Sequence, residues 1–292
     1  MKCFRDFFEF IPPLRLIITD ECNGKCGFCH KEGFQSVGDM PVDTIKECVQ
    51  IANDLNINHI CITGGEPSLR NDLPDILNYI ELNFSGNLVL TSNGANLLRF
   101  SDRINAPIFK LNISITSFHE EIAREYQNVD PNTIITILNN FPALHKNLNL
   151  VMVRENYDEI GDVIDFCVRN GVSLDVMSEL KEYDKEELEK YTEIIKKFKF
   201  DYRPYIDVFR TPKLVVYDDG KCKISIKHPS LNSIYVRDIC ARCINKCYEN
   251  ICAIRVYPDL KVSPCLNNTY VFDDKSLRNN IASAYYFVMN KI

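Results

Sequence analysis

Residues 22–29 read CNGKCGFC, so that Cys22, Cys26 and Cys29 form a CxxxCxxC triplet. The triplet follows an apolar run at residues 14–19, which we expect to be a β-strand, and it therefore places three thiols in one compact loop. A cubane [4Fe–4S] cluster normally takes four protein thiolates. Three cysteines would leave one iron open to a further ligand. The alternative that the spacing leaves open is a structural zinc site or a redox-active cysteine loop.

A second motif, Gly64-Gly65-Glu66-Pro67, ends another apolar run at residues 60–62. The two glycines allow a backbone turn that a side chain would block, so that backbone groups can approach a small ligand closely. Both motifs come directly after an expected strand.

With these two motifs, the chain resembles the radical SAM superfamily over roughly its first 200 residues. The resemblance implies that the triplet holds a [4Fe–4S] cluster whose open iron binds S-adenosylmethionine (SAM), and that an external reductant such as flavodoxin or ferredoxin supplies an electron. SAM is then cleaved to a 5′-deoxyadenosyl radical, which takes a hydrogen atom from a substrate.

The same resemblance implies roles for individual residues around SAM. Phe28 would pack on the adenine, Glu66 would accept a hydrogen bond from the SAM amine, and Arg154 would pair with a carboxylate. Loop packing, loop capping and core packing are the alternatives for these positions. The full set of expected cofactor-binding residues is Phe28, Gly64, Gly65, Glu66, Pro67, Ser92, Asn93, Ser114 and Arg154.

Short β-rich runs alternate with segments of helical periodicity over the first 200 or so residues. We expect strands at residues 14–19, 59–63, 88–91, 110–115, 149–153 and 174–177, and helices at 42–55, 73–82, 134–144, 158–169 and 184–198. Asp184 and Glu187 would form a capping box for the last of these helices. This order predicts an α/β fold, a partial (β/α)6 barrel resembling that of radical SAM enzymes, over residues 1–205.

The pattern changes after residue 205. Residues 208–209, 214–217 and 223–227 read as short antiparallel strands, a hairpin is expected near residues 253–265, and residues 277–288 read as a final helix. We therefore expect residues 206–292 to form a small second module.

Five cysteines gather in that module within a short stretch, a density typical of a metal site. Their positions and the hairpin ending in Pro-Cys-Leu resemble the auxiliary-cluster modules called Twitch and SPASM. The resemblance implies a second [4Fe–4S] cluster, with a tetrahedral zinc as the alternative. The expected ligands are Cys240, Cys243, Cys247 and Cys265, with Cys252 spare or alternative, and Cys222 is a candidate extra ligand.

Composition narrows the classes of function. The net charge of −6 argues against a dedicated nucleic-acid binder. No apolar stretch approaches the length of a membrane span, and the N-terminus lacks the core of a signal peptide. Thirteen cysteines without a secretion signal indicate metal and cluster ligands in the reducing cytoplasm.

The substrate is the least determined feature. Residues 14–29 and Arg255 resemble the GTP cyclase of molybdenum-cofactor biosynthesis, yet Cys61, Asn147 and Ala253 stand where that family has cationic pocket residues. Fewer cations disfavour a triphosphate. We therefore expect a paralogue acting on a small polar metabolite or nucleotide. The alternatives are a peptide-modifying enzyme, the GTP cyclase itself, and an iron–sulfur electron carrier, while His30 and His119 are acid–base candidates.

Overall fold

The computed structural model describes residues 11–32, 38–179, 185–197, 203–206, 212–227, 238–243, 251 and 253–290. The strands are β1 (Leu14–Ile17), β2 (His59–Thr63), β3 (Asn87–Ser92), β4 (Ile108–Ile115), β5 (Ala143–Met152), β6 (Ser173–Ser178), β7 (Arg203–Ile206), β8 (Pro212–Asp218), β9 (Lys223–Ile226), β10 (Ile254–Val256) and β11 (Val262–Ser263). The helices are α1 (Val42–Asp54), α2 (Leu73–Asn83), α3 (Glu120–Gln127), α4 (Pro131–Asn140), α5 (Ile160–Asn170), α6 (Lys185–Lys197), α7 (Asp238–Ala241) and α8 (Leu277–Asn290).

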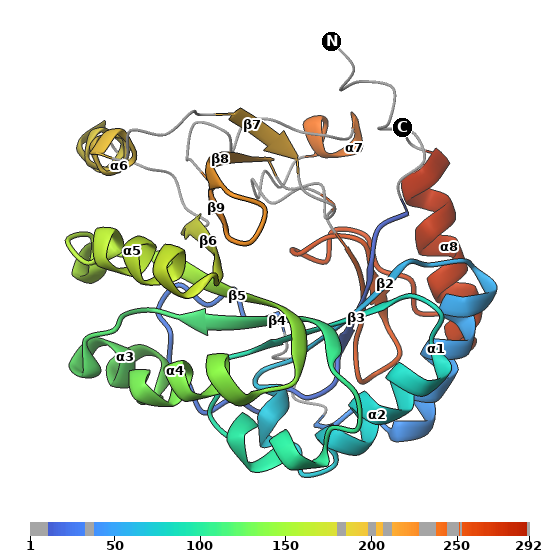
Figure 1. The fold of residues 1–292 in the computed structure, drawn as a ribbon. Coiled ribbons are helices and arrows are strands. Elements are labelled where there is room, and N and C mark those ends of the chain that lie inside the picture. The colour runs from blue at the N-terminus through green and yellow to red at the C-terminus, as the bar shows by residue number, and fades with distance from the viewer. Residues whose placement is uncertain are drawn as a thin grey trace.

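In the described part of the chain, these strands form one mixed sheet in the order β11-β10-β1-β2-β3-β4-β5-β6-β9-β8-β7. Strands β1 to β6 pair in parallel with their sequence neighbours, as the alternation of strands and helices predicts. Helices α1 to α5 cover one side of this curved sheet, and α8 lies beside α1 (Figure 1).

Strands from the C-terminal part of the chain extend the sheet at both ends. β9 pairs in parallel with β6, and β10 pairs in parallel with β1. Backbone hydrogen bonding is therefore continuous across the boundary that the sequence predicts near residue 205. Polar side chains from before and after this boundary lie on one sheet.

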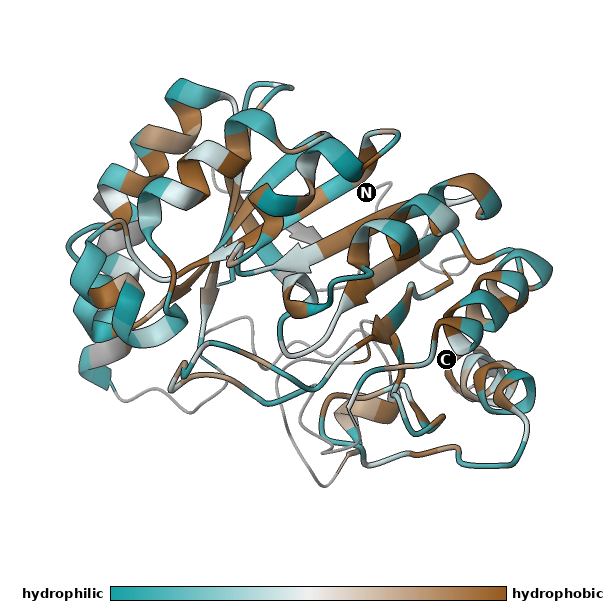
Figure 2. Ribbon diagram, turned by 90° about the horizontal axis from the view of Figure 1, so that it is seen from below, coloured by the Kyte–Doolittle hydropathy of each residue, from teal (hydrophilic) through white to brown (hydrophobic). Residues whose placement is uncertain are grey.

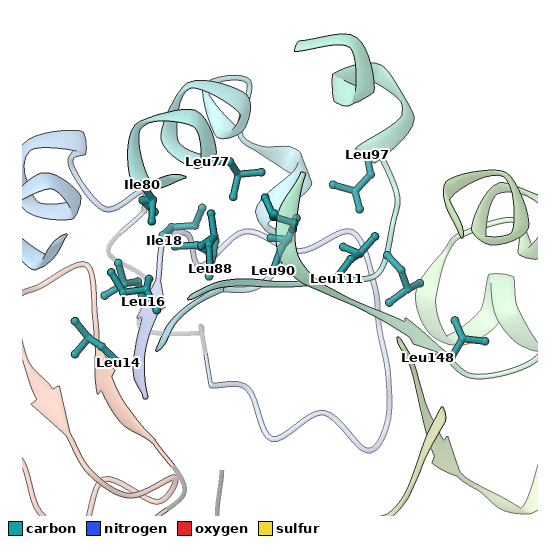
Figure 3. Close-up of a cluster of buried hydrophobic side chains, with 14 of the residues drawn as sticks. Leu14, Leu16, Ile18, Leu77, Ile80, Leu88, Leu90, Leu97, Leu111 and Leu148 are labelled. Carbon is teal, nitrogen blue, oxygen red and sulfur yellow. The ribbon is translucent and has the colours of Figure 1, made fainter. Parts of the chain in front are cut away.

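The period-2 alternation of the strands divides their side chains between a core and an open face. Figure 3 shows leucine and isoleucine side chains of β1, β3 and β4 packed with Leu77 and Ile80 of α2. In Figure 2 both the strands and the helices mix polar and apolar residues, as expected for elements with one buried face. The intervening strand residues point to the opposite face, and most of them are polar.

The expected elements agree with the structure except at particular places. The helix expected at residues 134–144 ends at Asn140 because Pro142 disfavours helical geometry in the residue before it, and β5 begins at Ala143, six residues before the expected strand. Helix α3 and strand β7 are absent from the sequence-based expectation. Asp184 and the strand expected at residues 208–209 lie outside the described residues. No described helix is long and apolar enough to cross a membrane.

Candidate functional site

A cavity of about 620 Å³ lies on the open face of the sheet. Side chains from β1 to β6 and from β8, β9 and β10 line it, and the loop that carries Cys22, Cys26 and Cys29 closes one end. All three cysteines of the triplet border the cavity. Because the ends of parallel strands meet at one edge of a sheet, the fold brings this loop and the loop after β2 together, as the sequence predicts.

The cysteine loop rests on the last turn of α3. Backbone N–H of Lys25 and the thiol of Cys26 both donate to the carbonyl oxygen of Tyr126, at 2.8 and 3.1 Å. The rings of Tyr126 and Phe28 stack with centroids 5.7 Å apart. Sequence reasoning missed this support because α3 is only eight residues long and strongly polar on average.

The donor set of the loop suits an iron–sulfur cluster. Backbone N–H groups of Gly24 and Lys31 donate to the sulfurs of Cys22 and Cys29, at 3.4 and 3.3 Å, and such bonds tune cluster thiolates. Within the described ranges, no three His, Cys, Asp or Glu side chains converge as one metal ion requires. A cubane instead distributes its thiolates over separate iron atoms, so the residues present fit a cluster better than a single ion.

Burial and neighbouring negative charge favour the protonated forms of the Cys22 and Cys26 thiols. Burial and the charges of Cys29 and Cys22 raise the pKa of Cys26 to about 11. Burial, together with the negative charges of Glu66 and Cys29, also raises the pKa of Cys22. The thiolate forms of Cys22 and Cys26 would therefore be favoured by a positively charged partner such as iron.

Gly64 and Gly65 allow the loop after β2 to pack directly on the cysteine loop. Their backbone meets Thr19 and Glu21, and N–H of Gly65 donates to the carbonyl oxygen of Thr19 at 2.8 Å. A Cβ on Gly65 would lie 2.1 Å from the carbonyl oxygen of Glu21, a distance that no side chain tolerates. The glycine pair is thus required by the contact between the two loops.

Glu66 holds the neighbouring loops through its buried carboxylate. Oε1 accepts hydrogen bonds from Ser68 N and Ser92 Oγ, at 2.8 and 2.6 Å, and Oε2 accepts one from Asn93 N at 2.6 Å. The Asn93 side chain in turn donates to Asn23 Oδ1 at 2.9 Å. This chain of contacts runs from the loop after β2 through the end of β3 to the cysteine loop. Burial of the Glu66 carboxylate raises its pKa.

Most of the other expected cofactor-binding residues line the same cavity, including Phe28, Ser92, Asn93 and Ser114. Pro67 is buried at the start of a 3-10 turn and is not among the lining residues. Arg154 is exposed in another turn and is also outside the lining. Among the acid–base candidates, His30 borders the cavity, whereas His119 is exposed before α3.

Glu32 joins the cysteine loop to the C-terminal strand β10. Its carboxylate lies between Arg15, at 3.1 Å, and Arg255, to which it is directly hydrogen bonded. His30 Nε2 lies 3.6 Å from the same carboxylate. Burial of Glu32 alone would raise its pKa, but the guanidinium groups of Arg15 and Arg255 hold the pKa well below its ordinary value.

The wall formed by β4, β5 and β6 is polar. Asn147 Nδ2 donates to Asn149 Oδ1 at 2.8 Å and to Asp175 Oδ2 at 3.4 Å. In the described structure, Asn112 Oδ1 and Ser178 Oγ are buried without a hydrogen-bond partner, and both residues border the cavity. Arg15 Nε is a third such atom. A buried polar atom without a hydrogen-bond partner lowers the stability of the fold, and a polar ligand that bonded to it would remove this cost.

Positive charge is in excess around the cavity. The described lining holds five lysines and two arginines against four carboxylates, in a chain whose net charge is −6, and one of these lysines, Lys146, donates from Nζ to the carbonyl oxygen of Leu138 on α4. Sequence reasoning from Cys61, Asn147 and Ala253 alone predicts that most pocket cations are gone. The structure adds other cations, since lysines of β4, β8 and β9 line the same space.

A second set of thiols lies within electrostatic reach of Tyr270. The pKa of Tyr270 is raised by partial burial and then by the charges of Cys243, Cys265 and Cys240, so all three thiols lie within electrostatic reach of its hydroxyl. The sulfur of Cys265 also accepts Thr269 N at 3.1 Å. Cys247 and Cys252 lie outside the described residues.

Among the remaining described cysteines, Cys61 lines the cavity, whereas Cys48, Cys167 and Cys222 lie outside its lining. Cys222 is buried at the start of β9, and its thiol donates to the carbonyl oxygen of Val172 at 3.1 Å. Burial raises its pKa to about 11. Cys48 and Cys167 are buried in the core. Cys222 therefore serves packing in this structure and contacts none of the expected ligands.

Solved structures share this fold. The structure of Streptococcus suis SuiB bound to the precursor peptide SuiA matches 95% of the chain with a TM-score of 0.65 and 17% identity, and the chain covers 65% of SuiB. Native anSMEcpe with bound AdoMet and a peptide matches 95% of the chain with a TM-score of 0.58 and 17% identity, and 81% of that protein is covered.

Sequence comparison gives closer relatives. A protein of Methanothermobacter thermautotrophicus named probable GTP 3′,8-cyclase is 28% identical over 283 residues, which cover 91% of this chain and 88% of the relative. A protein of Thermococcus kodakarensis with the same name is 27% identical, covering 92% and 90% of the two chains. The profile of the radical SAM superfamily matches residues 16–167, which include both the cysteine triplet and the Gly-Gly-Glu-Pro motif. The chain therefore belongs to the radical SAM superfamily.

Proposed function

We propose that this radical SAM enzyme abstracts a hydrogen atom from a small anionic metabolite or nucleotide. The observation that carries the proposal is the cavity itself, which runs from the cysteine loop to a wall rich in lysine and asparagine. Its volume of about 620 Å³ falls in the range of small-molecule sites. Its surplus of positive charge favours a negatively charged ligand.

In this proposal Cys22, Cys26 and Cys29 hold a [4Fe–4S] cluster, and SAM lies between them and the Gly-Gly-Glu-Pro loop. When bound, the cluster and SAM supply a one-electron cleavage that generates a 5′-deoxyadenosyl radical, which removes hydrogen from the substrate. Flavodoxin or ferredoxin would serve as the reductant. The protein side chains contribute binding, orientation and the exclusion of water.

The chain's own residues orient the cosubstrate and the substrate. Phe28, already stacked on Tyr126, offers a flat apolar surface for the adenine. Glu66 keeps Ser92 and Asn93 at the mouth of the cavity, and its Oε2, which accepts one bond from Asn93 N, retains capacity for the SAM amine. Ser114, on the cavity face of β4, would contact SAM from the opposite side. Arg154 and Pro67 lie outside the lining and are assigned no direct contact.

We further propose a second [4Fe–4S] cluster in the C-terminal region, held by Cys240, Cys243, Cys247 and Cys265. The gathering of three of these thiols around Tyr270 supports it. With four or five thiols available, such a cluster would be fully ligated, and it would stabilise this region or relay an electron. We propose that the chain is divided into a radical SAM core of residues 1–205 and a Twitch-like module of residues 206–292.

A second candidate function is the one in the relatives' printed name, the cyclisation of GTP. The high coverage of both chains and the lysines lining the cavity favour it. Against it, Cys61, Asn147 and Ala253 replace cations of that family, and Glu32 already neutralises part of the charge on Arg15 and Arg255. A different small anionic substrate therefore remains our main proposal.

The test is an anaerobic assay with reconstituted protein, SAM and dithionite, in which 5′-deoxyadenosine is quantified while candidate substrates are added one at a time. Nucleotides and sugar phosphates should stimulate its formation more than the matching nucleosides and free sugars. Consumption of GTP with formation of a cyclised product would favour the second candidate. Stimulation by peptides alone would contradict both.

A further inference from the structure

Three asparagines stand together on the cavity face of β4 and β5. Their chain neighbours Leu111 and Leu148 belong to the hydrophobic core (Figure 3), so strand alternation directs Asn112, Asn147 and Asn149 to the opposite face. All three asparagines line the cavity. Asn112 pairs in register with Asn147, and Asn149 follows Asn147 by two residues. The three amide groups therefore form one patch, which we call the asparagine patch.

Internal hydrogen bonds occupy one end of each amide group. Asn147 Nδ2 donates to Asn149 Oδ1 at 2.8 Å and to the carbonyl oxygen of Leu148 at 3.0 Å, so neither of its hydrogens is left for Asn112. Asn112 Nδ2 makes one long contact of 3.5 Å with Thr91 Oγ1. These contacts assign the oxygen and nitrogen ends of the amides.

The other ends of these amides have no partner among the residues that the structure describes. Asn112 Oδ1 is buried without a hydrogen bond, in a residue that is 9% exposed. Asn147 Oδ1 accepts no hydrogen bond, and Asn149 Nδ2 donates none, within the same ranges. The patch therefore offers two acceptors and one donor to a ligand, and leaving such groups unpaired costs stability.

We propose that the asparagine patch binds hydroxyl groups of the substrate, and that Asn112 selects a hydroxylated sugar over its deoxy analogue. A hydroxyl group both donates and accepts hydrogen bonds, so it can satisfy a patch that offers acceptors and a donor. An ammonium group only donates, and a phosphate or carboxylate only accepts. A site built to bond a hydroxyl group discriminates against the analogue that lacks it, because the buried partner is then left unpaired.

The patch lies beside the position proposed for SAM. Ser114, which we assign to SAM, follows Asn112 by two residues on β4 and pairs in register with Asn149. Two residues of strand span about 6.6 Å. A hydroxyl group held by Asn112 would therefore fix the neighbouring carbons of the substrate relative to the SAM site, which is how an orienting contact lowers a barrier.

This inference deepens the proposed function and rests on it, but its test does not require SAM cleavage. Calorimetric titration of the anaerobically reconstituted protein, without reductant, compares ribose 5-phosphate with 2-deoxyribose 5-phosphate, and GTP with its 2′- and 3′-deoxy analogues. The members of each comparison carry the same phosphates, so the ratio of their Kd values isolates the hydroxyl group. We expect at least one deoxy compound to bind at least tenfold more weakly than its hydroxylated counterpart.

Substitutions make the test specific to Asn112. Asn112→Leu removes the oxygen acceptor at nearly constant size and should bring the ratio of Kd values to within about twofold of unity. Asn112→Asp keeps an oxygen acceptor and should keep the preference for the hydroxylated compound. Asn105→Leu is the matched control, because Asn105 is exposed before β4, and it should keep the wild-type ratio.

Thermal melts distinguish a binding role from a structural one. Asn112→Leu should melt no lower than the wild type, because it removes an unpaired amide oxygen. Asn147→Leu should melt lower, because it removes two internal hydrogen bonds. The comparison of hydroxylated and deoxy compounds on the wild type needs no variant, so it holds even where a variant does not fold.

Three results would overturn the inference. The first is equal binding of the hydroxylated and deoxy compounds by the wild type, or no binding of any of them. The second is a wild-type ratio in Asn112→Leu. The third is a melting temperature of Asn112→Leu as low as that of Asn147→Leu, which would give Asn112 a structural role. Because 5′-deoxyadenosine formation is measured separately, a failure here and a failure of the proposed function remain distinguishable.

Discussion

Arg255 of β10 donates a hydrogen bond to Glu32, which follows the last cysteine of the triplet by three residues, so the C-terminal strand is tied to the cysteine loop across 223 positions of sequence. Arg15, the register partner of Arg255 on β1, binds the same carboxylate. Two arginines therefore share one buried anion directly beneath the cysteine loop. This contact makes the geometry of that loop depend on the C-terminal part of the chain.

Glu32→Gln should lower the free energy of unfolding at neutral pH by about 3 kcal/mol, the lower end of the cost of removing one partner from a buried ion pair. The lower end applies because the Arg15 side chain is 26% exposed and can be hydrated. Urea unfolding of the reconstituted protein measures the change. A matched control is Glu120→Gln, which breaks an exposed pair with Arg124 on α3. A loss no larger than that of the control would contradict the role of Glu32.

The same carboxylate predicts a dependence of stability on pH. The folded-state pKa of Glu32 lies well below its ordinary value, so its contribution is complete above the unfolded-state pKa of about 4.3 and is lost as the pH falls through the folded-state pKa. The difference in unfolding free energy between wild type and Glu32→Gln should therefore shrink as the pH is lowered below about 5. A difference that is constant with pH would show that the ion pair is not its origin.

Gly65→Ala should prevent the cysteine loop from holding iron. The new Cβ would meet the carbonyl oxygen of Glu21 at 2.1 Å, and this backbone contact cannot yield without moving the loop. Gly27→Ala is the matched control, because Gly27 lies in the cysteine loop itself and a Cβ there meets no atom within 4 Å. Iron and sulfide are measured per chain after anaerobic reconstitution. Equal iron in the two variants would contradict the close packing of the two loops.

Glu66→Gln should destabilise the loops around the mouth of the cavity. The carboxylate accepts three hydrogen bonds, and an amide would turn one acceptor into a donor facing an N–H group. We expect a loss of about 1–3 kcal/mol in the free energy of unfolding, the cost of leaving a buried polar group unsatisfied. Urea unfolding provides the measurement, and Glu81→Gln on α2 is the control. Wild-type stability in Glu66→Gln would show that the loop contacts tolerate the amide.

The iron content tests the second cluster. Replacing Cys22, Cys26 and Cys29 together by alanine should leave about 4 iron atoms per chain, the content of one [4Fe–4S] cluster. Adding Cys265→Ala should remove most of the rest, whereas adding Cys222→Ala, which alters a buried thiol bonded to Val172, should not. Zinc in place of iron in the triple variant would favour the tetrahedral zinc site instead.

The parallel strands are well predicted from the sequence because their period-2 and helical patterns are strong, and because both motifs follow strands. Helix α3 is missed because it is only eight residues long and has few apolar residues, and with it the support that Tyr126 gives to the cysteine loop is missed. The lysines of the cavity are missed as well. The alternation of Lys223, Ser225 and Lys227 is visible as a strand pattern, but which face of that strand meets the cavity depends on the parallel pairing of β9 with β6.

The most direct test of the proposed function compares 5′-deoxyadenosine formation by the anaerobically reconstituted wild type with that of the Cys22/Cys26/Cys29→Ala variant, in the presence of SAM, dithionite and a series of phosphorylated and unphosphorylated candidate substrates. We expect product from the wild type alone, with greater stimulation by the phosphorylated member of each pair. Equal amounts from both proteins, or none from an iron-replete wild type with any candidate, would contradict the proposed function.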